Sequence, residues 1–199
     1  MLHDWWYSFL DLSYSLLQIC IMKHLALFIC VTVLLCQSAA AQKKYVPQRS
    51  DYSFRTQVCT TTDDEGETVT DSIITYVTNK QGTYTIVSPT LPMDPEHWQG
   101  FGNIVEDDIN FDGIPDLMIC LGPMNAFGGF TYDGYAWDPK RHTFVKIENF
   151  DEILDPTFNK KDKTIVGTYR VDDEFEFSTY KLKNNKAVLI KKTHEKMDL

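Results

Sequence analysis

The sequence predicts an all-β domain built as an antiparallel hairpin meander. After residue 42, the chain consists of short segments rich in Thr, Val and aromatic residues, separated by Gly, Asn, Asp and Pro. Such segments fit pleated, half-buried strands, and the residues between them favour tight turns. No segment has apolar residues recurring every 3.6 positions over several turns, so we expect no long amphipathic helix. The pattern therefore predicts about eight or nine short strands, most of them joined as hairpins.

The first strands lie in the N-terminal half. Residues 52–61 alternate in polarity and predict a strand. An acidic turn at 63–67 follows, and its acids lack the alternate spacing of a metal loop, so we expect a solvated turn. Residues 68–77 and 83–88 predict a hairpin. Five of their side chains are expected in the core, namely Ile73, Ile74, Val77, Tyr84 and Ile86.

The C-terminal half repeats this pattern. Turn-forming pairs, Asp-Pro and Asn-Asn, separate runs that alternate between apolar and polar residues. Residues 149–154 can supply one helical turn before Pro156. The predicted strands are residues 131–137, 142–147, 164–171, 175–182 and 187–192.

Three segments are expected to be irregular. Residues 45–53 are polar and contain proline, which predicts a lead-in with little to pack. Residues 89–100 contain three prolines, and residues 122–130 contain several glycines. Loops carry recognition more often than the elements that they join. We therefore expect the second and third segments to form a contact surface.

Residues 106–117 carry the most specific pattern in the chain. Gly113 follows a run in which oxygen-bearing side chains alternate with apolar ones. In a calcium loop, side-chain oxygens occupy positions 1, 3, 5 and 9, glycine provides the sharp turn at 6, and a backbone carbonyl serves at 7. Crowded carboxylates repel each other unless a hard divalent cation neutralises them. The predicted calcium ligands are Asp108, Asn110, Asp112, Ile114 through its carbonyl, and Asp116.

This loop is not an EF-hand. Its position 12 is Ile119, where an EF-hand has a bidentate Glu, and Pro115 lies inside the loop. The apolar run at 117–121 is short and ends at Gly122, which predicts a buried strand. A surface loop rich in Asx-turns, with no metal, is the alternative interpretation.

The first 41 residues predict export. A short basic start after Met22, an apolar core at 25–36 and three alanines before Gln42 form the pattern of a signal peptide. The expected organisation is an upstream extension (1–21), a signal peptide (22–41) and a single β domain (42–199), located in the periplasm or secreted.

Two alternatives to a cleaved leader remain open. Cys36 could be a lipidation site, although Leu35 stands where a bacterial lipobox has a small residue. Residues 16–36 could span a membrane, but Lys23 interrupts the apolar run. We therefore expect residues 42–199 to contain no membrane span.

The predicted domain is acidic. The full chain has 19 basic and 28 acidic residues, a net charge of −9. Residues 1–41 hold Lys23, Asp4 and Asp11, which leaves 18 basic and 26 acidic residues in 42–199, a net charge of −8. Proteins that bind nucleic acids need a basic surface, so this class is excluded. The charge suits a basic partner or a bound cation.

The remaining residues show no catalytic motif. The sequence has no G-x-S-x-G, no H-E-x-x-H and no Gly-rich phosphate loop, so we expect no enzyme. Cys59 and Cys120 could pair in an oxidising compartment or remain buried thiols, and the sequence does not decide between the two.

The motif Asp108-x-Asn110-Phe111-Asp112-Gly113-x-x-Asp116-Leu117 resembles the calcium loop of FG-GAP-type repeats of β-propellers. The later residues resemble a family of exported bacterial proteins with a small propeller-like β fold. The positions that carry this resemblance are Tyr135-x-Trp137-Asp138-Pro139, Phe144, Leu154-Asp155-Pro156, Lys163-x-Ile165 and Tyr180-Lys181. The resemblance covers residues 100–192 and includes a single calcium loop.

The family includes an immunity protein that inhibits a lysozyme-like peptidoglycan hydrolase. The resemblance thus implies a calcium-binding, non-enzymatic domain whose protein partner is such a hydrolase. We expect a monomer, although the sequence does not determine the oligomeric state. The sequence departs from the family pattern at 122–127, where more glycine is expected, so its target can differ. An envelope module that binds glycan or protein, with a structural calcium site, is the alternative, and a hydrolase ranks last.

Overall fold

The computed structural model of the protein describes residues 45–124 and 129–197. All the described strands belong to the unit Val46–Leu199. The predicted leader, with Cys36 and the cleavage site before Gln42, lies outside the described residues, as do residues 125–128 of the predicted recognition loop. Within the described residues, no helix is long and apolar enough to cross a membrane.

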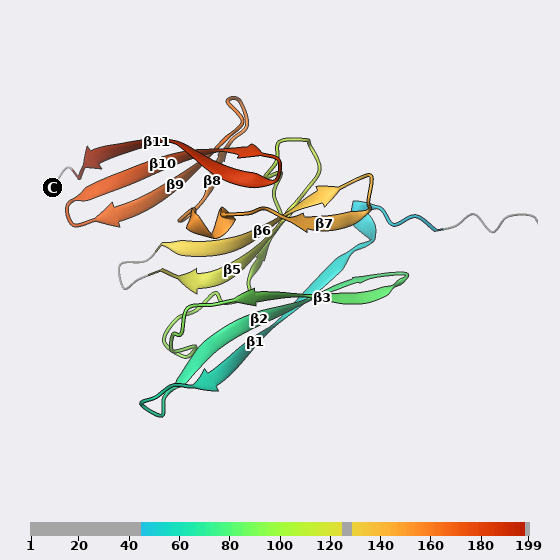
Figure 1. The fold of residues 1–199 in the computed structure, drawn as a ribbon, viewed down its shortest axis with the longest axis horizontal. Coiled ribbons are helices and arrows are strands. Elements are labelled where there is room, and N and C mark those ends of the chain that lie inside the picture. Colours follow the sequence, from blue (N-terminus) through green and yellow to red (C-terminus); the bar gives the residue numbers. More distant parts are fainter. Residues whose placement is uncertain (1–44, 125–128, 198–199) are drawn as a thin grey trace, which may run out of the picture. The chain divides into compact units, whose positions relative to one another are not determined.

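The described chain is all-β, as predicted, and its eleven strands form three antiparallel sheets (Figure 1). Each sheet is a meander in which strands adjacent in sequence are hydrogen-bonded neighbours. The N-terminal sheet contains β1 (Ser53–Thr62), β2 (Thr68–Asn79) and β3 (Gly82–Pro89). The central sheet contains β4 (Ile104–Val105), β5 (Leu117–Pro123), β6 (Phe130–Asp138) and β7 (Thr143–Lys146). The C-terminal sheet contains β8 (Thr157–Asn159), β9 (Thr164–Val171), β10 (Glu174–Lys183) and β11 (Lys186–Lys196).

All the strands expected from the sequence are present, but the expected number of eight or nine was too low. The two missed strands, β4 and β8, have only two and three residues, and both lie at the edge of their sheet. Strands this short carry no alternating pattern that a sequence could reveal. The single helical turn is confirmed as a 3₁₀ turn, η2 (Phe150–Glu152), and a second one, η1 (Arg49–Asp51), precedes β1.

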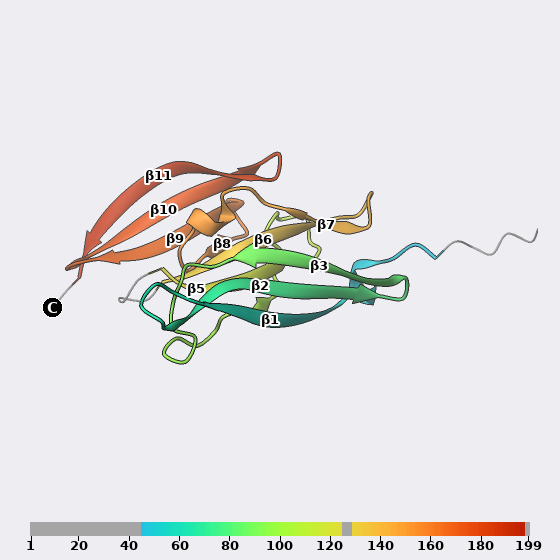
Figure 2. The ribbon, with the colours of Figure 1, turned by 60° about the horizontal axis from the view of Figure 1, so that its bottom comes forward.

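The central sheet packs against both of the others (Figure 2). Leu117 and Ile119 of β5 belong to a hydrophobic cluster shared with the N-terminal sheet, whereas Met118 between them belongs to a cluster shared with the C-terminal sheet. Successive side chains of a strand point to opposite faces. A strand covered on both faces must be apolar at every position, which explains why residues 117–121 form a continuous apolar run.

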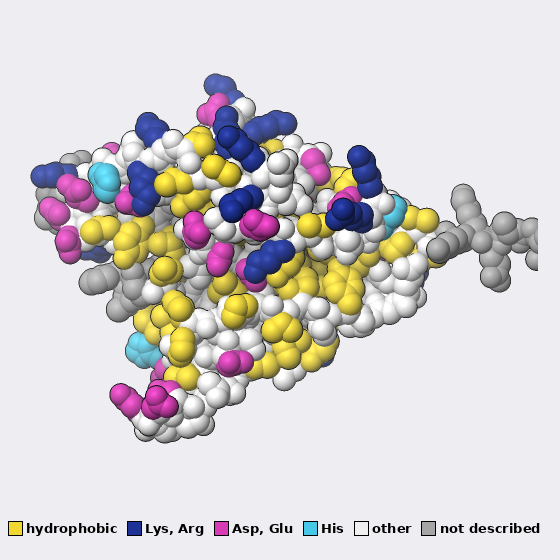
Figure 3. Space-filling model, viewed as in Figure 1, with side chains coloured by type: hydrophobic (Ala, Val, Ile, Leu, Met, Phe, Trp, Pro, Cys, Tyr) yellow, Lys and Arg dark blue, Asp and Glu magenta, His cyan; other side chains and the backbone are white. Residues whose placement is uncertain are grey.

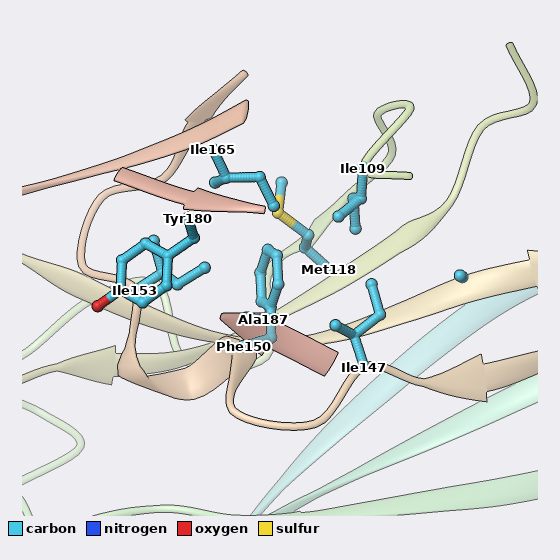
Figure 4. Packing of buried hydrophobic residues seen from close by; sticks show 9 residues of the cluster. Ile109, Met118, Ile147, Phe150, Ile153, Ile165, Tyr180 and Ala187 are labelled. Atoms are coloured by element: carbon cyan, nitrogen blue, oxygen red, sulfur yellow. The ribbon is translucent and has the colours of Figure 1, made fainter. Parts of the chain in front are cut away.

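The cluster between the central and C-terminal sheets surrounds Phe150, which is fully buried (Figure 4). Ile147 and Ile153 flank this ring in the sequence, and Ile165 and Tyr180 approach it from β9 and β10. A methyl group on Gly134 would lie 2.6 Å from the Phe150 ring. Glycine is thus needed in β6 so that the ring can lie against the backbone.

The cluster between the N-terminal and central sheets corrects part of the predicted core. Ile73 and Val77 are fully buried there, and Ile86 packs against them. Ile74 belongs to neither cluster, because the alternation along β2 turns it to the other face, where its cross-strand partner Val87 is 61% exposed. Tyr84 was also expected in the core but remains 38% exposed.

Among the described residues, Cys59 and Cys120 are separate free thiols, with Cys120 buried in β5 and Cys59 half-buried on β1. The acidic turn at 63–67 is the predicted solvated turn. One carboxylate oxygen of Asp63 accepts hydrogen bonds from the N–H groups of Glu65 and Glu67.

Candidate functional site

The predicted metal loop connects β4 to β5 and curls around the Asp108 carboxylate. The two Asp108 carboxylate oxygens accept hydrogen bonds from the N–H groups of Asp112, at 2.9 Å, and Gly113, at 3.0 Å. Gly113 has a φ of +88°, while nothing lies within 4 Å of the position that its Cβ would occupy. Backbone conformation, and not lack of space, therefore requires glycine there. This is the sharp turn predicted at the sixth position of the loop.

The next two predicted ligands bond to the same short stretch of chain. The side-chain oxygen of Asn110 accepts a hydrogen bond from the Asp112 N–H, at 2.9 Å. Asp112 in turn accepts one from the Ile114 N–H, at 2.8 Å, and another from the Asn110 amide, at 3.0 Å. Asn110, Asp112 and Asp108 thus direct their oxygens toward the interior of the loop, as the alternating sequence predicts.

Asp116 anchors the loop to the central sheet. The residue is fully buried, and its Oδ1 accepts a hydrogen bond from the Trp137 N–H on β6, at 2.7 Å. Its Oδ2 accepts one from the Asn110 N–H, at 3.0 Å. The pairing of β5 with β6 ends at Leu117, opposite Tyr135, so the carboxylate provides the next hydrogen bond in place of a strand residue.

The buried position of Asp116 has an electrostatic cost. Desolvation disfavours the ionised form and raises the pKa of Asp116 to about 6, while the backbone N–H groups of Trp137 and Asn110 oppose this shift. The nearby Asp112 carboxylate raises the pKa further. A buried carboxylate with this pKa is partly protonated near pH 6 unless a positive charge lies close to it.

The apolar residues of the loop attach it to both hydrophobic clusters. Ile109 is fully buried in the cluster shared with the C-terminal sheet, and Phe111 packs against that cluster. The rings of Phe111 and Phe158 contact edge to face, with their centroids 6.5 Å apart. Ile114 packs against the other cluster. The loop thus bridges the two layers on either side of the central sheet.

Arg49 holds the loop from the N-terminal side, a role that the sequence did not reveal. Its guanidinium donates a hydrogen bond to the Pro115 carbonyl, at 2.7 Å, and pairs with the Glu106 carboxylate. The same group lies over the rings of Phe54 and Phe144, 5.1 and 5.0 Å from their centroids. Contacts of this kind combine charge pairing with cation–π attraction.

The segment 45–53 therefore has more to pack than expected. Pro47 is buried, and only 11% of the Arg49 side chain is exposed. The Tyr52 ring contacts the rings of Trp137 and Phe144, and its hydroxyl donates a hydrogen bond to the His142 carbonyl, at 2.8 Å. The prediction of a loosely packed lead-in was wrong, because these contacts join residues distant in sequence.

Two observations bear on whether the loop suits a metal ion. Across the described residues, no three His, Cys, Asp or Glu side chains form a group that could hold a metal ion as arranged. The predicted donors are nevertheless all oxygens, which is the chemistry that calcium prefers, and they occur in the expected order around the expected turn. The set therefore fits a hard cation, provided that the side chains of Asp108, Asn110 and Asp112 turn from the backbone N–H groups toward a point shared with Asp116.

The two predicted recognition loops differ from expectation. Gly122 and Pro123 are buried residues of β5, and Gly122 is kept free of a side chain by the Phe101 ring, which a Cβ there would meet at 2.1 Å. The stretch after Pro89 stays beside β2, since the Thr70 N–H donates a hydrogen bond to the Met93 carbonyl. Most of the residues that follow Pro89 are at least partly exposed, as a contact surface requires.

Comparison with known proteins identifies no family for the chain. No family model matches it. No curated protein matches it either. Among solved structures, it is similar to a Xanthomonas type IV secretion system related protein, with 24% sequence identity and a TM-score of 0.49. The similarity covers 74% of this chain and 79% of the other. At this level, the similarity carries no argument about function.

The first prediction concerns the anchor. Asp116→Ala should destabilise the metal-free protein by about 2–6 kcal/mol, because it leaves the buried Trp137 N–H and the partly buried Asn110 N–H without an acceptor, each at a cost of about 1–3 kcal/mol. Urea unfolding in the presence of a chelator measures the loss. Asp138→Ala is the matched control, since Asp138 also accepts two backbone N–H groups but in an exposed turn. Equal effects of the two substitutions would contradict the anchoring role.

Proposed function

We propose that the protein is an exported, calcium-stabilised β domain that binds and inhibits a lysozyme-like cell-wall hydrolase and has no catalytic activity of its own. One observation carries the calcium part of this proposal. The side chains of an oxygen-rich loop accept hydrogen bonds from the loop's own backbone, and the buried Asp116 carboxylate anchors the loop. Such a loop suits a structural role better than a catalytic one, because its polar groups are already engaged by its own backbone.

The residues that would hold calcium are those predicted from the sequence. They are the side chains of Asp108, Asn110, Asp112 and Asp116 and the carbonyl of Ile114. A bound calcium ion supplies the positive charge that offsets the repulsion among these carboxylates and favours the ionised form of Asp116. The chain would then keep the Asp116 hydrogen bonds to Trp137 and Asn110 at neutral pH.

The role of the loop in recognition would be indirect. Asp107 and Glu106 lie at its start, and β4 lies immediately before it. The Asp116 N–H donates a hydrogen bond to the Asp107 carbonyl, at 2.8 Å. A well-ordered loop would therefore also fix the position of Asp107, next to β4 at the edge of the central sheet. A partner that contacts the edge would meet a surface whose shape depends on the loop.

The charge distribution supports a basic partner that docks away from β11. Net charge is negative, yet most of the Lys and Arg side chains visible in Figure 3 lie over the C-terminal sheet and the β6–β7 turn. Acidic side chains gather at the β1–β2 turn in the same view, and others lie at the left end of the C-terminal sheet and near the centre. Charge of the opposite sign accelerates encounter and charge of the same sign opposes it. A cationic hydrolase would therefore approach the central sheet and its borders, and not the lysine-rich strand β11.

A glycan-binding module is the second candidate, and one pocket favours it. A cavity of about 370 Å³ opens on the face of the C-terminal sheet that packs toward η2. Tyr169 and Tyr180 lie in its wall beside Glu176, which accepts hydrogen bonds from Ser178, at 3.0 Å, and from Lys192, at 2.7 Å. Aromatic rings combined with oriented polar groups are common in ligand pockets. Direct binding of peptidoglycan fragments at this pocket would favour the second candidate.

The second prediction tests the calcium site. Calcium at about 100 times its Kd should stabilise the wild-type protein by roughly 2.7 kcal/mol and raise its Tm. Asp112→Ala should abolish this rise, because it removes a central ligand. Thermal unfolding with calcium and with chelator measures both, and Asp151→Ala, which alters an exposed carboxylate of η2, serves as control. A wild-type Tm that chelator leaves unchanged would rule out the site.

The third prediction tests the activity. Peptidoglycan digestion by a susceptible lysozyme-type enzyme should be about tenfold slower when the protein is present at about ten times its Kd. High salt should weaken this inhibition, because it screens long-range attraction between unlike charges. The assay is run on a panel of such enzymes at two salt concentrations. Undiminished digestion across the whole panel would leave the binding-module hypothesis ahead.

A further inference from the structure

A second pocket lies beside the metal loop, between the central and C-terminal sheets. Its volume is about 510 Å³, within the range of ligand sites. The short strand β4 and the segment that enters β8 border it, and its walls are largely apolar or aromatic. The apolar and aromatic side chains that form the walls include Val105, Met118, Tyr132 and Phe158.

Two carboxylates, from Asp107 and Asp155, lie among these walls. Asp107 Oδ1 accepts a hydrogen bond from the Asp108 N–H, at 2.7 Å, and Asp155 Oδ1 accepts one from the Phe130 N–H, at 2.9 Å. These bonds orient both side chains, and a carboxylate has the capacity to accept further hydrogen bonds. The residues come from separate segments of the chain, so only the fold brings them to one pocket.

Tyr132 gives the pocket a neutral phenol. Burial is the main cause that raises the pKa of Tyr132 to about 12, and the nearby Asp155 carboxylate adds to it. Like any phenol below about pH 9, the ring is uncharged at physiological pH, and the Asp155 carboxylate lies close enough to affect it. A neutral ring near a carboxylate is a favourable surface for a cation.

We propose that this pocket receives a basic side chain, Arg or Lys, from the protein partner, an inference that rests on the proposed function. Such a side chain combines an apolar stem with a charged end. The stem would lie against Met118 and Phe158, and the charge would pair with Asp107 and Asp155. Carboxylates favour Arg in particular, because its planar guanidinium presents several N–H donors in one plane.

The chain already recognises a basic side chain in this way on the other side of the loop. Arg49 lies against the rings of Phe54 and Phe144 while it pairs with Glu106. The pocket offers the same combination of aromatic ring and carboxylate. The overall excess of acidic residues, 26 against 18 in residues 42–199, favours a cationic occupant as well.

Lys160 is an internal competitor for the pocket. Its ammonium lies 3.4 Å from Asp107 Oδ1, and its side chain is 66% exposed. Exposed ion pairs are weak and exchange easily with solvent. A partner's guanidinium can therefore displace this lysine. Removal of Lys160 should strengthen binding of a cation, whereas loss of either carboxylate should weaken it.

A small-molecule probe tests the pocket without the partner. The protein is labelled with ¹³C in its methionine methyl groups, and N-acetyl-arginine amide is added at millimolar concentration. We expect the Met118 resonance, assigned with Met118→Leu, to shift on titration. N-acetyl-citrulline amide, which has a similar shape and no charge, should shift it at least about fivefold less at the same concentration. Equal shifts with the two compounds would overturn the proposal.

Variants test the pocket with the partner. Against a hydrolase that the protein inhibits, Asp107→Asn and Asp155→Asn should each raise Kd about threefold to tenfold, and Lys160→Met should lower it about twofold to fivefold. Asparagine retains an oxygen for the backbone hydrogen bond, and an unchanged Tm confirms that each variant folds. If hydrolase binding is tight but none of the three variants alters Kd, the pocket is not the contact. If arginine binds and no hydrolase does, the pocket stands and the proposed partner is wrong.

Discussion

The buried carboxylate of Asp116 is the contact on which the rest of the structure depends. It accepts one N–H from the loop and one from β6, and thereby joins an irregular segment to the middle layer of the domain. The loop residues Ile109 and Ile114 then reach the hydrophobic clusters on opposite sides of the central sheet. A short segment with no strand of its own thus helps to hold three sheets together.

This arrangement solves a problem that a small β domain faces. The two hydrophobic clusters are separate, and each must be covered by short strands. Because β5 and β6 lie between the two clusters, one sheet contributes side chains to both of them. The middle layer must therefore be apolar on both faces. The polar groups of the loop are then confined to one end of that layer. Their mutual repulsion and the burial of Asp116 make this end the place where a cation would stabilise the fold most.

The sequence was informative wherever local chemistry determines structure. The turn at Gly113, the continuous apolar run of β5 and the hairpins follow from residue type and spacing. The sequence did not predict contacts between distant segments. Examples are the hydrogen bond from Arg49 to the Pro115 carbonyl and the presence of Asp107 and Asp155 in the lining of one pocket. It also misassigned Ile74, because a hairpin pattern does not state which face is covered. Strands as short as β4 exist only because a longer neighbour pairs with them.

Hydrogen exchange of the Trp137 amide tests the central claim most directly. If the loop and its cation hold Asp116 against β6, calcium at about 100 times its Kd should slow exchange of the Trp137 and Asn110 amides by up to about a hundredfold, since their opening would release the ion. The Met197 amide, bonded to the Asp173 carbonyl far along the C-terminal sheet, should exchange at an unchanged rate. Trp137 and Asn110 amides that exchange equally fast with calcium and with chelator would contradict the account.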